Sequence, residues 1–149
     1  MYKNYRVRKK NGKFRVISEP SPELKAMQWA ILAQLETIPL LDCVHGFVQG
    51  RDVVSNATPH KQQRYVLNID VKDFFPSIKA ERCLHQVSRW RAWTSDELDW
   101  MEAICFWEGV LPQGAPTSPV LANIYMHPFD VYMELLAKRL GLSYTRYAD

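Results

Sequence analysis

Two aspartates in this chain follow short apolar stretches: Asp70 lies in NIDVKDFFPSI and Asp149 in YTRYAD. Burying a carboxylate without a partner is costly, so Asp70 requires a cation, a metal ion or solvent. Two carboxylates on adjacent strand ends are what a paired divalent-ion site needs, because Mg²⁺ prefers hard oxygen ligands and commonly takes one or two carboxylates plus substrate phosphates. Two such ions about 4 Å apart can activate an attacking hydroxyl and stabilise the leaving oxygen of an in-line displacement.

A cationic arm at the N-terminus could bind phosphate. Between Lys3 and Lys25 the sequence has eight Lys or Arg residues against two acidic ones, whereas the whole chain has a net charge of only +3. An arm of this kind beside two carboxylates would hold a triphosphate, and the combination indicates nucleotidyl transfer. Two alternatives stay open: the arm is a solvated hairpin, and Asp70 or Asp73 caps the turn that follows it.

Three segments follow one another along the chain: NIDVKDFF, LPQGAPTSPVLAN and YTRYAD. They resemble the A, B and C motifs of reverse transcriptases. The resemblance extends upstream to YRVRKKNGKFRVISEPS and to GFVQGRDVVSNATPH at 46–60. NATPH followed by VLNIDVKDFFPSI is most similar to bacterial retron reverse transcriptases, while group II intron enzymes match NATPH less well.

This resemblance implies an α+β fold: the fingers and partial palm of a right-hand polymerase, with an incomplete antiparallel palm sheet and packed helices. Residues 1–149 would form one fingers/palm unit, fingers-like over about 1–63 and palm-like over about 64–149. Motif C of the family reads Tyr-Ala-Asp-Asp, and this sequence ends at the first Asp. We therefore expect the 149 residues alone to be inactive.

The resemblance also implies a role for each matching residue. Asp70 and Asp149 would hold two Mg²⁺ ions, with the Val71 carbonyl as a further ligand and Mn²⁺ as an alternative ion. Phe75 would be a steric gate that crowds the space of a ribose 2′-OH, or else one more core aromatic. The nucleotide would be contacted by Arg15, Lys9 or Lys10, Arg51, Gln113 and Gly114.

Three positions keep open alternatives. Arg51 is either a phosphate or template contact or a partner in a surface salt bridge. Asn56 and His60 match the retron-like segment NATPH without an evident chemical role, and His60 is equally a satisfied structural histidine.

The implied reaction is attack of a primer hydroxyl on the α-phosphate of a dNTP, directed by an RNA template. In retrons the template is a cognate structured noncoding RNA that also supplies the priming 2′-hydroxyl. Two other functions remain: a group II intron or diversity-generating type of reverse transcriptase, and a truncated non-catalytic module that binds RNA or a partner protein.

Local patterns predict the elements that must position these residues. Alternation over 5–16 around Asn11-Gly12 predicts a hairpin. Ser21-Pro22 predicts the start of a helix that ends before Pro39, and helical spacing predicts an inward face made of Leu24, Met27, Ile31 and Leu35. We expect a strand over 64–71, ending near Asp70.

Further along, Ser77 is expected to cap a helix that runs to about Trp93. Thr94 and Glu97 predict a capping box for the next helix. A Pro- and Gly-rich turn over 111–119 precedes a helix of about 20 residues that ends at Gly141. A last strand is expected over 142–147.

The amino-acid composition restricts the classes of protein to which this chain can belong. Hydrophobic residues at 47% and charged residues at 23% exclude disorder and low-complexity classes for the whole chain. Three scattered cysteines predict neither a disulfide framework nor a zinc site, which suits a reducing cytoplasm. No apolar run approaches the roughly 20 residues of a membrane span, so we expect a cytoplasmic protein without a membrane partner.

Overall fold

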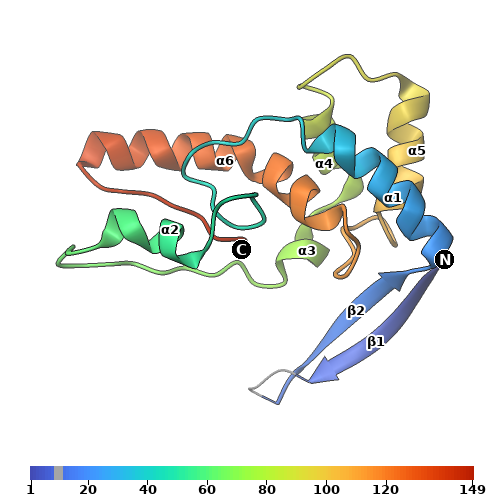
Figure 1. The fold of residues 1–149 in the computed structure, drawn as a ribbon, viewed down its shortest axis with the longest axis horizontal. Coiled ribbons are helices and arrows are strands. Elements are labelled where there is room, and N and C mark those ends of the chain that lie inside the picture. The colour runs from blue at the N-terminus through green and yellow to red at the C-terminus, as the bar shows by residue number, and fades with distance from the viewer. Residues whose placement is uncertain (9–11) are drawn as a thin grey trace.

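The computed structural model describes residues 1–8 and 12–149. These residues form a two-stranded antiparallel sheet, six α-helices and one short 3₁₀ helix, which confirms a mixed α and β chain. Figure 1 shows the helices gathered into one body, with the hairpin projecting from it beside the start of α1. No helix in the described part of the chain combines the length and apolarity needed to cross a membrane.

The predicted N-terminal hairpin is confirmed. Strand β1 (Tyr2–Arg8) pairs with β2 (Phe14–Pro20), so that Tyr2 lies opposite Pro20 and Arg8 opposite Phe14. Asn11 lies outside the described residues. Tyr2 is buried at the base of the hairpin, whereas the rest of β1 is exposed. On β2, Ser18 and Pro20 are buried against the body, so the hairpin is attached mainly through β2 and its base.

Helix α1 (Pro22–Leu35) begins as its sequence predicts and ends four residues before Pro39. The Ser21 hydroxyl accepts a hydrogen bond from the backbone N–H of Leu24, and Pro22 occupies the first turn, where its missing N–H is not needed.

The inward face of α1 differs from the predicted one at Met27, whose side chain is 47% exposed. Gln28 is buried instead. Its amide nitrogen donates to the Tyr2 hydroxyl at 2.7 Å and to the Ile104 backbone oxygen at 2.6 Å. These two acceptors satisfy the amide nitrogen of Gln28, so this polar side chain can be buried. The apolar periodicity had predicted its neighbour Met27 at the inward face.

The central helices are α4 (Ala80–Val87), α5 (Ser95–Cys105) and α6 (Ser118–Leu140). The Thr94–Glu97 capping box is present at the start of α5. Gly141 ends α6 in a left-handed conformation at φ 67°, as predicted. With α1 and α3 (Phe74–Ser77) these helices enclose one core, whose largest fully buried apolar side chains are Leu35, Ile78, Met101, Leu111, Leu121 and Ile124.

The helix predicted from Ser77 to about Trp93 is wrong in its bounds. Ser77 is the last residue of α3. Ile78 then takes an extended conformation (φ −86°, ψ 105°) and its backbone oxygen accepts from Leu111 N–H. This tertiary hydrogen bond interrupts the helical path, and α4 begins two residues later and ends at Val87.

Both predicted palm strands are wrong as well. After α2 (Val53–Ala57) and the 3₁₀ helix η1 (Thr58–His60), residues 61–73 form no strand, and Leu67 is 86% exposed. Residues 142–147 contribute only an isolated parallel bridge between Arg146 and Val44. A strand needs a hydrogen-bonded neighbour, and among the described residues neither segment has one along its length.

All three cysteines are buried and free. Burial raises the pKa of the Cys43 and Cys105 thiols to about 11. They therefore remain thiols at neutral pH and serve as small core side chains.

Candidate active site

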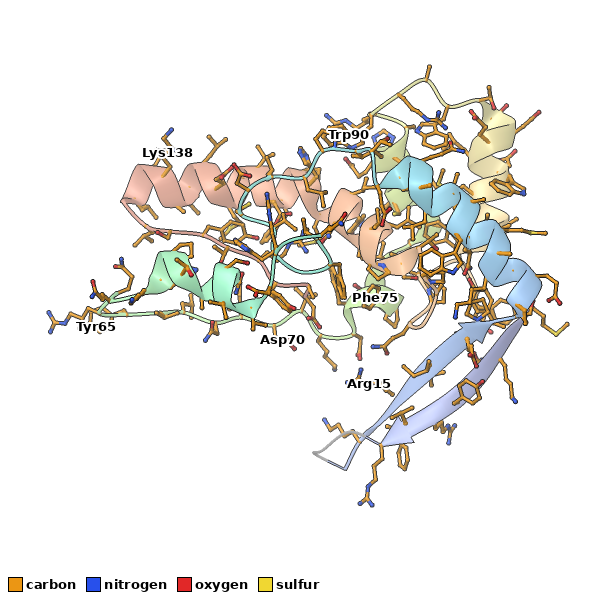
Figure 2. All side chains as sticks on the ribbon, viewed as in Figure 1. Arg15, Tyr65, Asp70, Phe75, Trp90 and Lys138 are labelled. Carbon is orange, nitrogen blue, oxygen red and sulfur yellow. The ribbon has the colours of Figure 1, made fainter. Side chains whose placement is uncertain are left out.

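A pocket of about 360 Å³ lies where the hairpin, the segment before α3 and the last residue of the chain meet. Six residues singled out in the sequence line it: Arg15, Asp70, Val71, Phe75, Gln113 and Asp149. In Figure 2, Arg15 on the hairpin lies across from Asp70 and Phe75. The fold thus brings residues from the start, middle and end of the sequence into one cavity.

The acidic side of the pocket is made by Asp70 and Asp149, which are both exposed. Among the described residues there is no cluster of three or more His, Cys, Asp or Glu side chains that could bind a metal ion by themselves. Two carboxylates and the Val71 backbone nevertheless provide hard oxygen donors, and Mg²⁺ commonly completes its shell with water and substrate phosphates. The donor set fits a divalent ion that arrives with a nucleotide.

The sequence left open that an aspartate of this segment caps the turn that follows it, and Asp73 is in the position to do so. It occupies the N-cap position of α3 but makes no side-chain capping hydrogen bond, and its φ is 51°. Asp73 also lines the pocket. The carboxylates in this segment therefore do not serve to cap the short helix that follows.

Phe74 and Phe75 are neighbours with different surroundings. Phe74 is 4% exposed and belongs to the core, and it also lines the pocket that Phe75 lines. Phe75 is half-buried, with its ring centroid 5.5 Å from that of Phe74 and 6.2 Å from that of Phe47. The core holds one side of the Phe75 ring while the residue also lines the pocket. This placement suits a rigid wall of the cavity.

Gln113 reaches the pocket from a turn that is bonded to the hairpin. The Ser18 backbone N–H donates to the Gln113 backbone oxygen at 2.8 Å. Gly114 follows at φ 129°, and a Cβ there would lie 2.9 Å from the Ser18 backbone oxygen. Only glycine permits both this backbone conformation and this close approach. The other side of the turn is fixed by the Ser118 hydroxyl, which donates to the Pro112 backbone oxygen at 2.7 Å.

Asp149 is positioned by a backbone connection to the loop that follows α1. Arg146 donates its N–H to the Cys43 oxygen at 2.8 Å and accepts from the His45 N–H at 2.8 Å. At Gly46 a Cβ would lie 2.2 Å from the backbone nitrogen of Ala148. The close packing of these two backbones therefore requires glycine at position 46.

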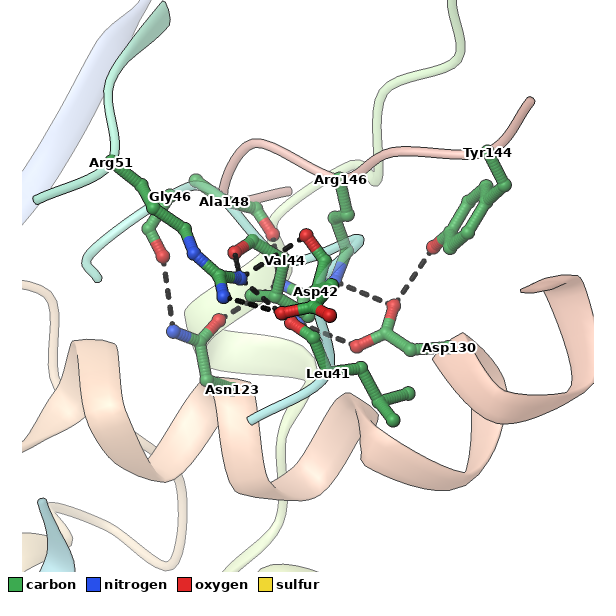
Figure 3. A network of polar contacts seen from close by, with 10 residues as sticks. All are labelled: Leu41, Asp42, Val44, Gly46, Arg51, Asn123, Asp130, Tyr144, Arg146 and Ala148. Carbon is green, nitrogen blue, oxygen red and sulfur yellow. Dashed lines mark hydrogen bonds and ion pairs between the residues drawn. The ribbon is translucent and has the colours of Figure 1, made fainter. Parts of the chain in front are cut away.

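Beneath this connection lies a buried polar network, drawn in Figure 3. The Arg146 guanidinium donates from Nε and from one terminal nitrogen to the two Asp130 carboxylate oxygens, at 2.8 and 2.7 Å. Asp130 is 0% exposed and Arg146 6%. The other terminal nitrogen of Arg146 donates to Asn123 Oδ1 at 3.0 Å. Tyr144 donates its hydroxyl to Asp130 at 2.8 Å, and burial together with this carboxylate raises the pKa of Tyr144.

Sequence reasoning overlooked Asp130 and assigned no role to Arg146. One signal was available: Asp130 follows Asn123 by seven residues, so a helix places both on the same face. Its significance depends on Arg146, which lies beyond the end of α6 and is brought back to that face only by the fold.

Arg51 does not line the pocket, and its side chain contacts the loop that follows α1. One of its terminal nitrogens donates to the backbone oxygens of Leu41, Asp42 and Val44 at 2.8, 3.1 and 2.6 Å, and the other pairs with the Asp42 carboxylate at 2.9 Å. This is the salt-bridge alternative that the sequence left open. Its effect is to hold together the loop that supports Arg146.

Asn56 and His60 also lie outside the pocket, next to the C-terminal segment. His60 Nε2 is 2.7 Å from the Thr145 hydroxyl, which donates to the Asn56 backbone oxygen at 3.2 Å. His60 is thus a satisfied histidine that connects NATPH to YTRYAD. Lys9 and Lys10, the remaining predicted contacts, lie outside the described residues.

Comparison with known proteins gives these motifs a family context. The family described as "Reverse transcriptase (RNA-dependent DNA polymerase)" matches residues 7–149. Retron Mx162 reverse transcriptase of Myxococcus xanthus is 38% identical over 166 residues, which cover 99% of this chain and 34% of that protein. Retron Ec86 reverse transcriptase of Escherichia coli is 38% identical over 154 residues, covering 99% and 47%.

Retron Ec83 reverse transcriptase of Escherichia coli is 32% identical over 158 residues, covering 99% of this chain and 51% of the relative. This chain therefore spans between about a third and a half of the length of these three proteins. The resemblance inferred from the motifs is confirmed.

Proposed function

The chain belongs to the reverse transcriptase (RNA-dependent DNA polymerase) family, and we propose that it forms part of a retron-type RNA-directed DNA polymerase. The reaction is transfer of a nucleotide from a dNTP to a primer hydroxyl on an RNA template, with release of pyrophosphate. In this proposal residues 1–63 contribute to the fingers and residues 64–149 to the palm.

One observation carries the proposal: six residues expected to act on a nucleotide line a single pocket, although they come from four separate segments. Family membership alone would be compatible with a decayed site. The shared cavity supports an arrangement in which phosphate, sugar and metal could be bound together.

Within this pocket Asp70 and Asp149 would hold divalent ions through their carboxylates, with the Val71 carbonyl as a further oxygen donor. Two Mg²⁺ ions bound there, or Mn²⁺ in their place, would lower the pKa of the attacking hydroxyl and stabilise the leaving oxygen. The exposure of both carboxylates suits this role, since it leaves room for phosphate and water.

The other wall of the pocket binds the nucleotide. Arg15 on β2 pairs with the triphosphate, because its planar guanidinium matches phosphate oxygens. Phe75 excludes a 2′-hydroxyl, since its ring is packed against Phe74 and Phe47 and cannot withdraw without disturbing them. Gln113 contacts the sugar from the turn bonded to β2.

The three relatives described above are all retron enzymes, which favours this type over a group II intron or diversity-generating enzyme. The template we propose is a structured noncoding RNA encoded beside the enzyme. A primer-extension assay comparing that RNA with an unrelated RNA of equal length tests this choice: equal use of both would contradict it.

The central experiment is Asp70→Asn in the full-length protein, measured as dNTP incorporation on a primed RNA and as RNA affinity by fluorescence anisotropy. We expect incorporation to be lost while RNA affinity stays nearly unchanged. The matched control is Asp73→Asn, which removes the same charge from the same pocket and should reduce incorporation much less.

Persisting incorporation in Asp70→Asn would refute the metal assignment. If the unmodified full-length protein binds RNA but incorporates nothing with either Mg²⁺ or Mn²⁺, the non-catalytic binding module is the better description.

A further inference from the structure

Ala148, the residue before Asp149, has a left-handed backbone with φ 69°. A residue with a Cβ rarely adopts this conformation, because the Cβ crowds the following carbonyl. Such a conformation persists only where its surroundings hold it in place. It also sets the direction in which the next residue leaves the chain, and that residue is the carboxylate of the pocket.

The Arg146 side chain is hydrogen-bonded to the backbone of Ala148. The terminal nitrogen that donates to Asn123 also donates to the Ala148 backbone oxygen at 2.7 Å. The guanidinium therefore bonds the backbone only two residues further along its own chain. Figure 3 shows Ala148, Asn123 and Asp130 surrounding the same Arg146 side chain.

The Arg146 guanidinium is in turn held by two side chains of α6, Asp130 and Asn123. Asp130 grips it through both carboxylate oxygens, and Asn123 accepts from it while donating its own Nδ2 to the Gly46 backbone oxygen at 3.0 Å. A bidentate pair of this kind fixes orientation as well as distance. The rigid helix thus determines where the Arg146 donors point, and through them the position of Ala148.

We propose that Arg146 is a positioning residue, which fixes Asp149 in the metal-binding pocket by holding Ala148 in its left-handed conformation. The inference rests on the proposed function, since it assigns Arg146 to the same carboxylate. Arg146 touches neither nucleotide nor metal in this role. It acts on metal affinity through two residues of backbone.

The test is Mn²⁺ binding to the full-length protein without nucleotide, measured by electron paramagnetic resonance of free and bound ion. Arg146→Lys keeps the charge that Asp130 requires but cannot donate to Asp130, Asn123 and Ala148 with the same fork. We expect Mn²⁺ affinity to fall about tenfold, the lower end of the effect typical of groups that orient metal ligands.

Two further variants distinguish a specific effect on the position of Asp149 from a general loss of stability of the buried network. Tyr144→Phe removes one hydrogen bond from Asp130 and leaves the Arg146–Ala148 contact in place, so Mn²⁺ affinity should change less than twofold. Ala148→Gly in the Arg146→Lys background should restore part of the affinity, because glycine adopts positive φ without the Cβ penalty.

If Arg146→Lys does not fold, Ala148→Val in the unmodified protein tests the same backbone without disturbing the ion pair, and it should lower Mn²⁺ affinity because a β-branched residue disfavours positive φ. Unchanged affinity in Arg146→Lys, an equal loss in Tyr144→Phe, or unchanged affinity in Ala148→Val would each overturn the inference. Unchanged affinity in Asp70→Asn and Asp149→Asn would instead overturn the proposed metal site.

Discussion

Ser18 of β2 and Gln113 of the turn before α6 are joined by a backbone hydrogen bond of 2.8 Å. Through it the base of the hairpin is attached directly to the turn that carries Gln113. Arg15 lies three residues from Ser18 on the same strand, so two residues proposed to contact one nucleotide are held by one backbone connection. Their spacing depends on how closely these two segments approach.

Gly114→Ala should separate the two segments. The added Cβ would lie 2.9 Å from the Ser18 oxygen, and φ 129° is unfavourable for alanine. We expect a loss of stability of about 1–3 kcal/mol and a raised KM for dNTP in the full-length enzyme. Gly109→Ala is the matched control, since Gly109 also has positive φ but no atom within 4 Å of an added Cβ. It should lose stability without a change in KM, and an equal KM effect would contradict the role of the Ser18–Gln113 approach.

Arg15→Ala should weaken nucleotide binding by removing the cation that lines the pocket from the hairpin. A charge-assisted contact to phosphate contributes about 1.5–3 kcal/mol, so the KM for dNTP should rise at least about tenfold. Arg6→Ala removes the same charge from β1 and should raise KM less, because Arg6 does not line the pocket. Steady-state kinetics on a primed RNA measure both KM values. Equal increases in KM would mean that Arg15 acts only as one of several cations on the hairpin surface and makes no specific contact with the nucleotide.

Phe75→Ala should admit ribonucleotides while largely preserving the use of dNTPs, because the proposed gate is the ring itself. The measurement is the ratio of kcat/KM for dNTP to that for rNTP. Phe106→Leu is the comparison: it alters another phenylalanine of the core, 5% exposed and not lining the pocket, and should lower stability without changing the ratio. If Phe75→Ala discriminates as well as the parent, Phe75 is only a packing residue.

Alkaline pH should destabilise the chain through Tyr2. Burial raises the pKa of Tyr2 from 10 to about 12, so the fold favours the neutral phenol. The stabilisation is complete below pH 10 and is lost as the pH rises from 10 through about 12.

Urea unfolding between pH 8 and pH 11.5 measures this loss. Tyr2→Phe should be less stable at pH 8, by about 1 kcal/mol, because Gln28 loses a partner. Its stability should then fall less steeply with pH than that of the parent. It should not become flat, because the pKa of Tyr144 is raised in the same direction. Parallel curves for the two proteins would contradict the assignment to Tyr2.

Helix ends were predicted correctly where the determining contacts are local. The Ser21 cap, the Thr94–Glu97 box and Gly141 each act within a few residues of backbone, so the sequence near them contains all the required partners. The motif residues of the pocket could likewise be named in advance, because their types and order match a known family.

The predictions failed where the partner is distant. Extended segments at 64–71 and 142–147 have the composition of strands, but a strand is stable only beside another, and neither finds one along its length within the described residues. Met27 and Gln28 are adjacent on α1, and apolar periodicity favoured Met27. Gln28 is buried because the Tyr2 hydroxyl and the Ile104 backbone oxygen, from other parts of the fold, accept hydrogen bonds from its amide nitrogen.

The sequence by itself determined the family and the local helix caps, and it singled out the two carboxylates that line the pocket. Tertiary structure alone decided how Asp149 is supported. Asp130 and Arg146 are ordinary charged residues in the sequence, and each alone would be costly to bury. Their burial becomes tolerable only when α6 and the C-terminal segment lie together, because each then neutralises and hydrogen-bonds the other.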